Sequence, residues 1–310
     1  MVYNWFSACF TVFHGSLRIP FQNFTNLTEY GVSSMGRNFY LQGENGLRLG
    51  CWHILPYEVA VNYQGSVLNA KEMELLMETL NYPIIVYFHG NSFDRSHPTR
   101  CGLYNLLTGM GFHVLALDYR GYGDSNGSPS ESGLIEDAKE IFRYAKSHSG
   151  SSNIYLWGHS MGTAVATAAA MELSENGSTP AGLILESPFN NLHDVVTHHP
   201  YALPFRWLPW FEKMVLKPLD RCGLDMSTDY RITKVDCPVL ILHAEDDHII
   251  PLHLAHKLHK SALDAKRDVT LEEFEASRRF HHKFIYLADE LPKILTRFTE
   301  RCNLNMKKVA

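Results

Sequence analysis

Residues 153–163 read Asn-Ile-Tyr-Leu-Trp-Gly-His-Ser-Met-Gly-Thr, an apolar run that leads directly into a Gly-x-Ser-x-Gly pentapeptide. The apolar run predicts a buried strand, and the alanine-rich residues from Thr163 onward predict a helix. A serine between these elements stands on a sharp turn that lifts its hydroxyl above the sheet edge. The turn needs glycine on both sides because the strand and the helix crowd it. The stretch therefore predicts that Ser160 is a nucleophile.

Similar apolar runs recur along the chain, at residues 83–88, 112–117, 181–185 and 238–242. Continuous apolar runs of this length are typical of strands that helices cover on both faces. The segments between the runs carry apolar residues at helical spacing. Alternating strands and helices imply parallel pairing with right-handed crossovers. We therefore predict an α/β fold with a doubly wound, mostly parallel sheet.

One interval, residues 190–230, breaks this alternation because it has no predicted strand and is rich in aromatic residues and proline. We interpret it as a helical cap inserted into an α/β core. The core then comprises residues 41–189 and 231–310. Residues 1–40 precede the sheet as an N-terminal extension.

The composition excludes several classes of protein. The chain has 310 residues, of which 45% are hydrophobic and 20% charged, so it is an ordinary globular protein. Acidic residues outnumber basic ones by 33 to 28, whereas a nucleic-acid binder is usually basic. The six cysteines form no Cys-x-x-Cys pair, which argues against a zinc knuckle or a redox site. We expect no metal and no cofactor.

A serine nucleophile needs a base and an acid that orients the base. In folds with this kind of turn the acid follows a late strand, and the histidine comes after it. Two candidates, Asp246 and Asp247, follow the predicted strand at 238–242. We choose Asp247 because the acid normally stands four residues before the proline of such a turn, here Pro251.

The base should follow the next strand, expected near residues 271–274. His281 and His282 both stand there, just before a helix predicted over 284–298. Both cannot reach Ser160 and Asp247 at once. We expect His282 to be the base and His281 to be exposed or supporting.

The oxyanion of the reaction needs two converging N–H donors. One should be the backbone amide of Met161, directly after the nucleophile. The other should be the amide of Asn91, in the turn after the strand at 83–88, where Gly90 permits an unusual backbone. A further glycine-rich turn, residues 118–125, has no Gly-Lys-Ser/Thr of a phosphate loop, so we expect it to pack beside the serine.

The chain resembles the α/β-hydrolase superfamily at the segments that carry these residues. The resemblance narrows to the α/β-hydrolase-domain type-twelve family of lysophosphatidylserine and monoacylglycerol lipases, and it runs from about Arg18 to Thr299. It is carried by residues 88–91, 118–125, 157–163, 185–191, 242–247 and 282–286. The resemblance places the family's nucleophile on Ser160, its acid on Asp247 and its histidine on His282.

We therefore expect a serine hydrolase that cleaves the acyl ester of single-chain lipids, a lysophospholipid or a monoacylglycerol, through an acyl-enzyme. A protein depalmitoylase is an alternative, and a non-catalytic binding scaffold is another. Trp207 and Trp210 lie three residues apart in the cap, so in a helix they would share one face. We expect that face to contact the acyl chain or a membrane surface.

The resemblance also implies an endoplasmic-reticulum membrane protein with a luminal catalytic domain. The apolar segment at residues 5–13 is too short to cross a bilayer, so a cytoplasmic location is the alternative. Four Asn-x-Ser/Thr sequons permit glycosylation in a secretory compartment; they begin at Asn23, Asn26, Asn126 and Asn176. We expect a lipid substrate, a membrane surface and no nucleic acid as partners.

Overall fold

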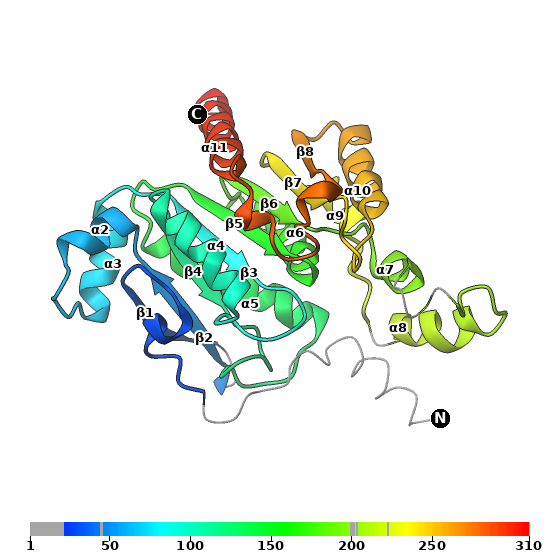
Figure 1. Cartoon of the computed structure of the whole chain (residues 1–310), viewed down its shortest axis with the longest axis horizontal. Coiled ribbons are helices and arrows are strands. Elements are labelled where there is room, and N and C mark those ends of the chain that lie inside the picture. Colours follow the sequence, from blue (N-terminus) through cyan, green and yellow to red (C-terminus); the bar gives the residue numbers. More distant parts are fainter. Residues whose placement is uncertain (1–21, 44–45, 199–201, 203, 222, 310) are drawn as a thin grey trace.

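The computed structural model describes residues 22–43, 46–198, 202, 204–221 and 223–309, and it shows an eight-stranded sheet between two layers of helices (Figure 1). The strands lie in the order β1-β2-β4-β3-β5-β6-β7-β8. Their bounds are β1 (Gly36–Gln42), β2 (Arg48–Ile54), β3 (Ile84–Phe88), β4 (His113–Leu117), β5 (Ile154–His159), β6 (Gly182–Glu186), β7 (Val239–Ala244) and β8 (Val269–Phe274). The pairs β1–β2 and β2–β4 are antiparallel, and all the others are parallel. The predicted mostly parallel α/β fold is confirmed.

The helices fill the connections between these strands. The α-helices are α2 (Tyr57–Asn62), α3 (Ala70–Thr79), α4 (Pro98–Gly109), α5 (Glu131–Ser147), α6 (Met161–Glu175), α7 (Leu192–His198), α8 (Lys217–Arg221), α9 (Thr228–Ile232), α10 (Leu252–Asp264) and α11 (Leu291–Val309). Shorter turns of helix are η2 (Leu27–Tyr30), η4 (Glu212–Leu216), η5 (Ala276–Arg278) and η6 (Ile285–Leu287); η4 is a π-helix and the others are 3₁₀. None of the helices in the described part of the chain combines the length and apolarity needed to cross a bilayer.

The sheet separates two hydrophobic cores, and β3 contributes to both because its side chains alternate between faces. Ile84, Val86 and Phe88 pack into the core beneath α5, α6 and α10. Ile85 and Tyr87 pack into the core beneath α4 and α11. Burial on both faces explains why this strand is a continuous apolar run.

The strands predicted from apolar runs match β3 to β8 within two residues at each end. The β1–β2 hairpin was not predicted, and β1 begins at Gly36, inside the range assigned to the N-terminal extension. The segment at residues 5–13 lies outside the described residues. In the predicted cap, the described residues form α7, η4, α8 and α9 without a strand.

The order of the strands positions the site. The chain leaves β4, crosses β3 through α5 and forms β5 on the other side of β3. Strand β3 therefore lies between β4 and β5 (Figure 1). The ends of β3 and β5 are in register, with Phe88 paired to Gly158. The turn after β3 and the turn after β5 therefore meet at a topological switch point, where α/β sheets usually bind ligands.

Candidate active site

Ser160 stands between β5 and α6 in a strained backbone conformation, with φ of 53° and ψ of −121°. Its N–H donates a 2.9 Å hydrogen bond to the carbonyl oxygen of Glu186 on the neighbouring strand. A Cβ atom on Gly158 would lie 2.3 Å from the carbonyl oxygen of Gly162, and one on Gly162 would lie 2.1 Å from that of Phe88. Only glycine fits at either position, as the pentapeptide predicts for a serine held on a sharp turn.

Asp247 and His282 form a buried pair. The Nδ1 atom of His282 lies 2.7 Å from Oδ2 of Asp247, and the amides of Ile249 and Ile250 donate to Oδ1 at 2.8 and 2.9 Å. Burial by itself raises the pKa of Asp247, but the hydrogen bond and charge of His282, the nearby His243 and the Ile250 amide lower it to about 2. The carboxylate is ionised at neutral pH, so it holds the His282 ring with Nδ1–H as the donor.

Ser160 and His282 line the same cavity, which has a volume of about 350 Å³. Asn91 and Met161, the two predicted oxyanion donors, also line it. Its apolar wall comes from the loop after β6, from α7, from the loop before α9 and from the loop after β7: Phe189, Leu192, Val195, Met226, Ile249 and Ile250. The structure thus brings the predicted nucleophile, the predicted base and the two predicted oxyanion donors around one cavity of mainly apolar character.

The glycine-rich turn at residues 118–125 packs against the turn that carries Asn91. The hydroxyl of Tyr122 donates a 2.7 Å hydrogen bond to Oδ1 of Asn91. A Cβ on Gly123 would lie 2.0 Å from Oδ2 of Asp118, so the chain passes directly over this buried carboxylate. The turn supports the wall of the site, as the sequence suggested.

His281 and Asp246 form a second pair outside the cavity. Nδ1 of His281 lies 2.9 Å from Oδ2 of Asp246, and the His281 amide donates to Oδ1 at 2.9 Å. Neither residue lines the cavity that contains Ser160. Of the competing residues, the structure therefore places Asp247 and His282 with Ser160.

Trp207 and Trp210 lie away from this cavity. They are 77% and 43% exposed and stand in turns that precede η4, not in a helix. The guanidinium of Arg206 lies 4.6 Å from the ring centroid of Trp207. These rings do not line the cavity of Ser160, and their contact with an acyl chain or a membrane surface stays a prediction.

Sequence reasoning assigned no role to three buried polar residues at the carboxyl ends of strands: His159, Glu186 and His243. Nε2 of His159 lies 2.8 Å from the carbonyl oxygen of His282, and burial together with His282 lowers the pKa of His159 well below its ordinary value. The neutral ring donates to that carbonyl and holds the backbone of the base. The sequence signal that could have identified these three residues is a polar residue at the end of a buried apolar strand.

Glu186 is a second buried carboxyl near the pair. Its Oε2 accepts a 2.9 Å hydrogen bond from Nε1 of Trp157. Burial raises the pKa of Glu186 to about 7; the bond from Trp157 lowers it and the charge of Asp247 raises it. Unlike Asp247, its carboxyl forms no hydrogen bond or ion pair with a histidine in the described part of the chain, although His159 is its neighbour on β5.

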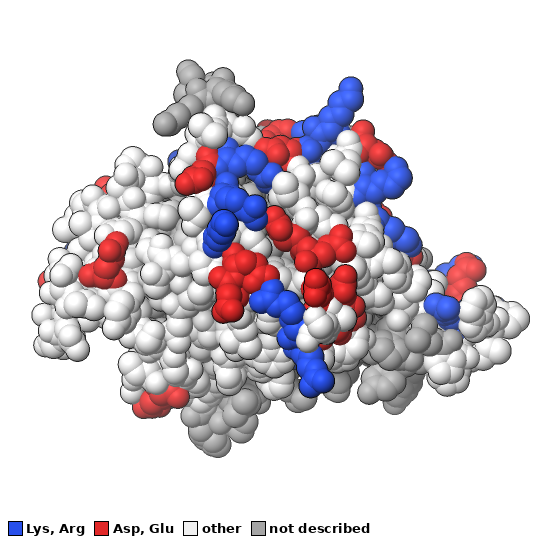
Figure 2. Space-filling model, turned by 45° about the horizontal axis from the view of Figure 1, so that its top comes forward, with Lys and Arg blue, Asp and Glu red and all other residues white. Residues whose placement is uncertain are grey.

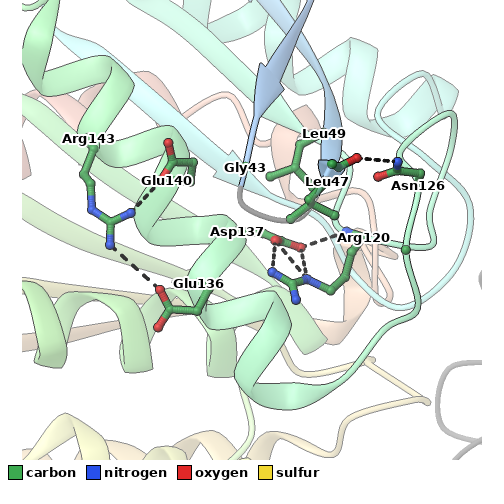
Figure 3. Close-up of a pocket in the computed structure, with 11 residues that line it drawn as sticks. Gly43, Leu47, Leu49, Arg120, Asn126, Glu136, Asp137, Glu140 and Arg143 are labelled. Atoms are coloured by element: carbon green, nitrogen blue, oxygen red, sulfur yellow. Dashed lines mark hydrogen bonds and ion pairs between the residues drawn. The ribbon is translucent and has the colours of Figure 1, made fainter.

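A larger cavity, of about 550 Å³, lies elsewhere, between the β1–β2 hairpin and α5 (Figure 3). Its charged residues neutralise one another: Arg120 pairs with Asp137 at 2.6 Å, and Arg143 with Glu140 at 2.6 Å. The lining residues include no serine, cysteine or histidine. This cavity lacks the groups that acyl transfer requires.

Acidic and basic side chains are intermixed across the centre of the face in Figure 2. Neither sign forms a continuous stripe on this face. Nucleic-acid binding surfaces usually cluster Lys and Arg along one face. The face in view does not have that character.

Comparison with known proteins places the chain among lipid hydrolases. A family model described as serine aminopeptidase S33 matches residues 83–230. Lysophosphatidylserine lipase ABHD12 of Xenopus tropicalis is 42% identical over 267 residues, which are 84% of this chain and 68% of that protein. The Danio rerio enzyme of the same name is 38% identical over 293 residues, 93% of this chain and 75% of that protein.

Solved structures agree on the fold. An esterase of Pyrococcus furiosus superimposes with a TM-score of 0.65 at 18% identity, covering 92% of this chain and 96% of the esterase. An α/β-hydrolase of Vibrio vulnificus gives a TM-score of 0.64 at 22% identity, covering 87% and 82%. The fold and the sequence identity lead to one assignment: the chain belongs to the ABHD12 family of α/β-fold serine hydrolases.

Proposed function

We propose that this serine hydrolase cleaves the acyl ester of lysophosphatidylserine, with Ser160, His282 and Asp247 as its catalytic triad. The observation that carries the triad is that His282, which lines one cavity with Ser160 on its strained turn, is hydrogen-bonded on its other side to the buried Asp247. The identity of about 40% to lysophosphatidylserine lipases supports the choice of substrate.

The reaction proceeds through an acyl-enzyme. Oγ of Ser160 attacks the ester carbon while Nε2 of His282 takes the serine proton. The amides of Asn91 and Met161 stabilise the oxyanion, and each such donor is worth about 10²–10³ in kcat. His282 then gives its proton to the glycerol oxygen of the departing glycerophosphoserine, and the acyl group stays on Ser160. Water, deprotonated by His282, releases the fatty acid.

The shape of the cavity favours a single acyl chain. Its apolar wall includes Leu192 and Val195 of α7, from the segment we interpret as the cap. Each methylene of an acyl chain buried on such a wall contributes about 0.8 kcal/mol. A volume of about 350 Å³ is near the lower end for ligand pockets and suits one chain better than two.

We also propose that the enzyme works at a membrane surface, at the endoplasmic reticulum as the family resemblance implies. The exposed rings of Trp207 and Trp210 support this, because tryptophan prefers the boundary between lipid and water. Fractionation of cells that express the full chain, with an alkaline wash and glycosidase treatment, tests location and glycosylation together. Recovery of the unglycosylated chain only in the cytosol would reject the endoplasmic-reticulum assignment.

The function is tested with a fluorophosphonate probe and a panel of substrates that share one acyl chain: lysophosphatidylserine, monoacylglycerol and a palmitoylated peptide. Ser160→Ala should lose labelling and at least about 10³-fold of its kcat on the preferred ester. Ser174→Ala, farther along α6, is the matched control and should retain both. Preference for the palmitoylated peptide would favour the depalmitoylase alternative. A wild-type chain that neither binds the probe nor turns over any ester would be a binding scaffold.

A further inference from the structure

The cavity of Ser160 contains two cationic residues, Arg100 and Lys283, and no Asp or Glu among its lining residues. Arg100, on α4, is buried, and its guanidinium donates to the carbonyl oxygens of Ser92 and Asp94 and, at 3.4 Å, to that of Gly90. Lys283 is half-buried and follows His282 directly. The two cations therefore lie beside the reacting groups.

Two other arginines of the described chain, the buried Arg95 and the partly buried Arg231, have carboxylate partners. Arg95 pairs with Asp118 and Asp124, and Arg231 pairs with Glu131. In the part of the chain that the structure describes, neither Arg100 nor Lys283 forms such an ion pair. An unpaired buried charge is costly, so its retention calls for an explanation.

The surroundings of Lys283 show the same lack of a counter-charge. Its Nζ lies 5.8 Å from the ring centroid of Phe93, on the loop that follows the predicted oxyanion turn. Burial and the charge of Arg100 both lower the pKa of Lys283. The carboxylate of Asp94, near Arg100 along the chain, instead accepts hydrogen bonds from Ser96. An anion bound here would relieve the repulsion between the two cations.

We infer that Lys283, with Arg100 behind it, forms a subsite for the phosphate of a lysophospholipid head group. The inference rests on the proposed function and deepens it. His282 protonates the departing alcohol, and in a lysophospholipid that alcohol carries the phosphate. The head group therefore leaves on the side of His282, where Lys283 is the next residue, while the acyl chain stays against the apolar wall.

The test compares Lys283→Met with Lys283→Arg. For each variant, kcat/KM is measured on lysophosphatidylserine and on monoacylglycerol with the same acyl chain. We expect Lys283→Met to lower the ratio of the two values at least about tenfold, the range of one charge-assisted hydrogen bond. Lys283→Arg should keep most of the ratio. The matched control, Lys71→Met at an exposed position on α3, should leave both values as in the wild type. An unchanged ratio in Lys283→Met would overturn the inference.

A second arm separates a head-group contact from attraction to an anionic surface. Turnover of monoacylglycerol is measured in phosphatidylcholine vesicles with and without added phosphatidylserine. A head-group subsite predicts the same relative rate for Lys283→Met on both vesicles. A defect that appears only on the anionic vesicles would overturn the subsite in favour of surface attraction.

A third arm does not depend on lipid turnover. Glycerophosphoserine, the head group without an acyl chain, should slow fluorophosphonate labelling of the wild type and of Lys283→Arg but not of Lys283→Met. Equal protection of all three proteins would overturn the subsite. If the wild type fails to hydrolyse lysophosphatidylserine, the proposed function fails, and this arm still reports on the subsite.

Discussion

The two histidine–aspartate pairs beside β7 contain the same residue types at similar distances, 2.7 Å for His282–Asp247 and 2.9 Å for His281–Asp246. They differ in burial. The side chains of the inner pair are 7% and 0% exposed, and those of the outer pair are 45% and 14% exposed. A short distance between histidine and carboxylate is therefore a weak sign of catalysis. Burial and a nucleophile in the same cavity separate the inner pair from the outer one.

The backbone explains why adjacent residues face different surroundings. His281 has a positive φ of 48°, so the chain turns sharply between the two histidines. Asp247 is held by the amides of Ile249 and Ile250, which direct its carboxylate inward. A hydrogen bond to a carboxylate is stronger in the low-dielectric interior than in water, whereas an exposed pair contributes about 0–1 kcal/mol.

Replacing each histidine in turn by alanine tests the difference between the two pairs most directly. His282→Ala should reduce kcat by a factor on the order of 10⁶, as loss of the base does in other serine hydrolases. His281→Ala should stay within about threefold of the wild type, because a surface pair contributes little. Steady-state rates on one lipid ester decide the matter. A larger loss in His281→Ala would reverse the assignment of the two pairs.

Replacing each acid by its amide gives the next largest effect. Asp247→Asn should lower kcat by about 10⁴, because an amide no longer stabilises the imidazolium or selects the right tautomer. Asp246→Asn should lower it less than about tenfold. Circular dichroism of both variants serves as the control for folding. Similar rates for the two would mean that Asp247 does not orient the base.

Glu186 sharpens the comparison, because it is a buried carboxyl without a histidine partner. Its pKa of about 7 lies above the ordinary 4.5, so the folded state keeps a proton that the unfolded state has lost. Stability should therefore fall as the pH rises from about 4.5 to 7, by up to about 3 kcal/mol. Urea unfolding at pH 5 and pH 8 measures this slope.

Glu186→Gln should flatten that slope, since glutamine carries no proton equilibrium and still accepts the bond from Trp157. Glu175→Gln, at an exposed position on α6, is the control and should keep the slope of the wild type. If Glu186→Gln loses as much stability between the two pH values as the wild type, Glu186 is not the group that titrates.

The smallest effect concerns Trp207 and Trp210 of the cap, which do not line the cavity of Ser160 and His282. Changing Trp207 and Trp210 together to alanine should reduce turnover of a long-chain lipid in vesicles several-fold, because exposed tryptophan rings favour the boundary between lipid and water. A soluble acetate ester should lose much less, since these rings do not line the cavity of Ser160. Values of kcat/KM for both substrates decide it. Equal losses would indicate that the rings stabilise the fold.

The sequence was sufficient to predict the parallel sheet and the sharp turn that carries Ser160. Apolar runs of β3 to β7 identify strands because burial on both faces leaves no room for polar residues. Glycines at 158 and 162 identify the turn because the neighbouring carbonyl oxygens exclude any Cβ. Strand β1 escaped notice because it lies at the edge of the sheet and mixes polar and apolar residues. Strand β2 is buried, but Gly50 and His53 interrupt its apolar run. Local sterics and burial on both faces of a strand therefore produce patterns that can be recognised in the sequence.

Other features depended on contacts between residues far apart. His281 and His282 are alike in sequence, and only the position of Asp247, 35 residues earlier, separates them. Likewise, Arg100 and Lys283 line one cavity although 183 positions separate them in the sequence. Neither composition nor spacing shows that these two residues lack a carboxylate partner. Burial, electrostatic pairing and the lining of a cavity are properties of three-dimensional proximity. Only the folded chain determines these properties, because the packing of distant segments decides which charged groups are desolvated.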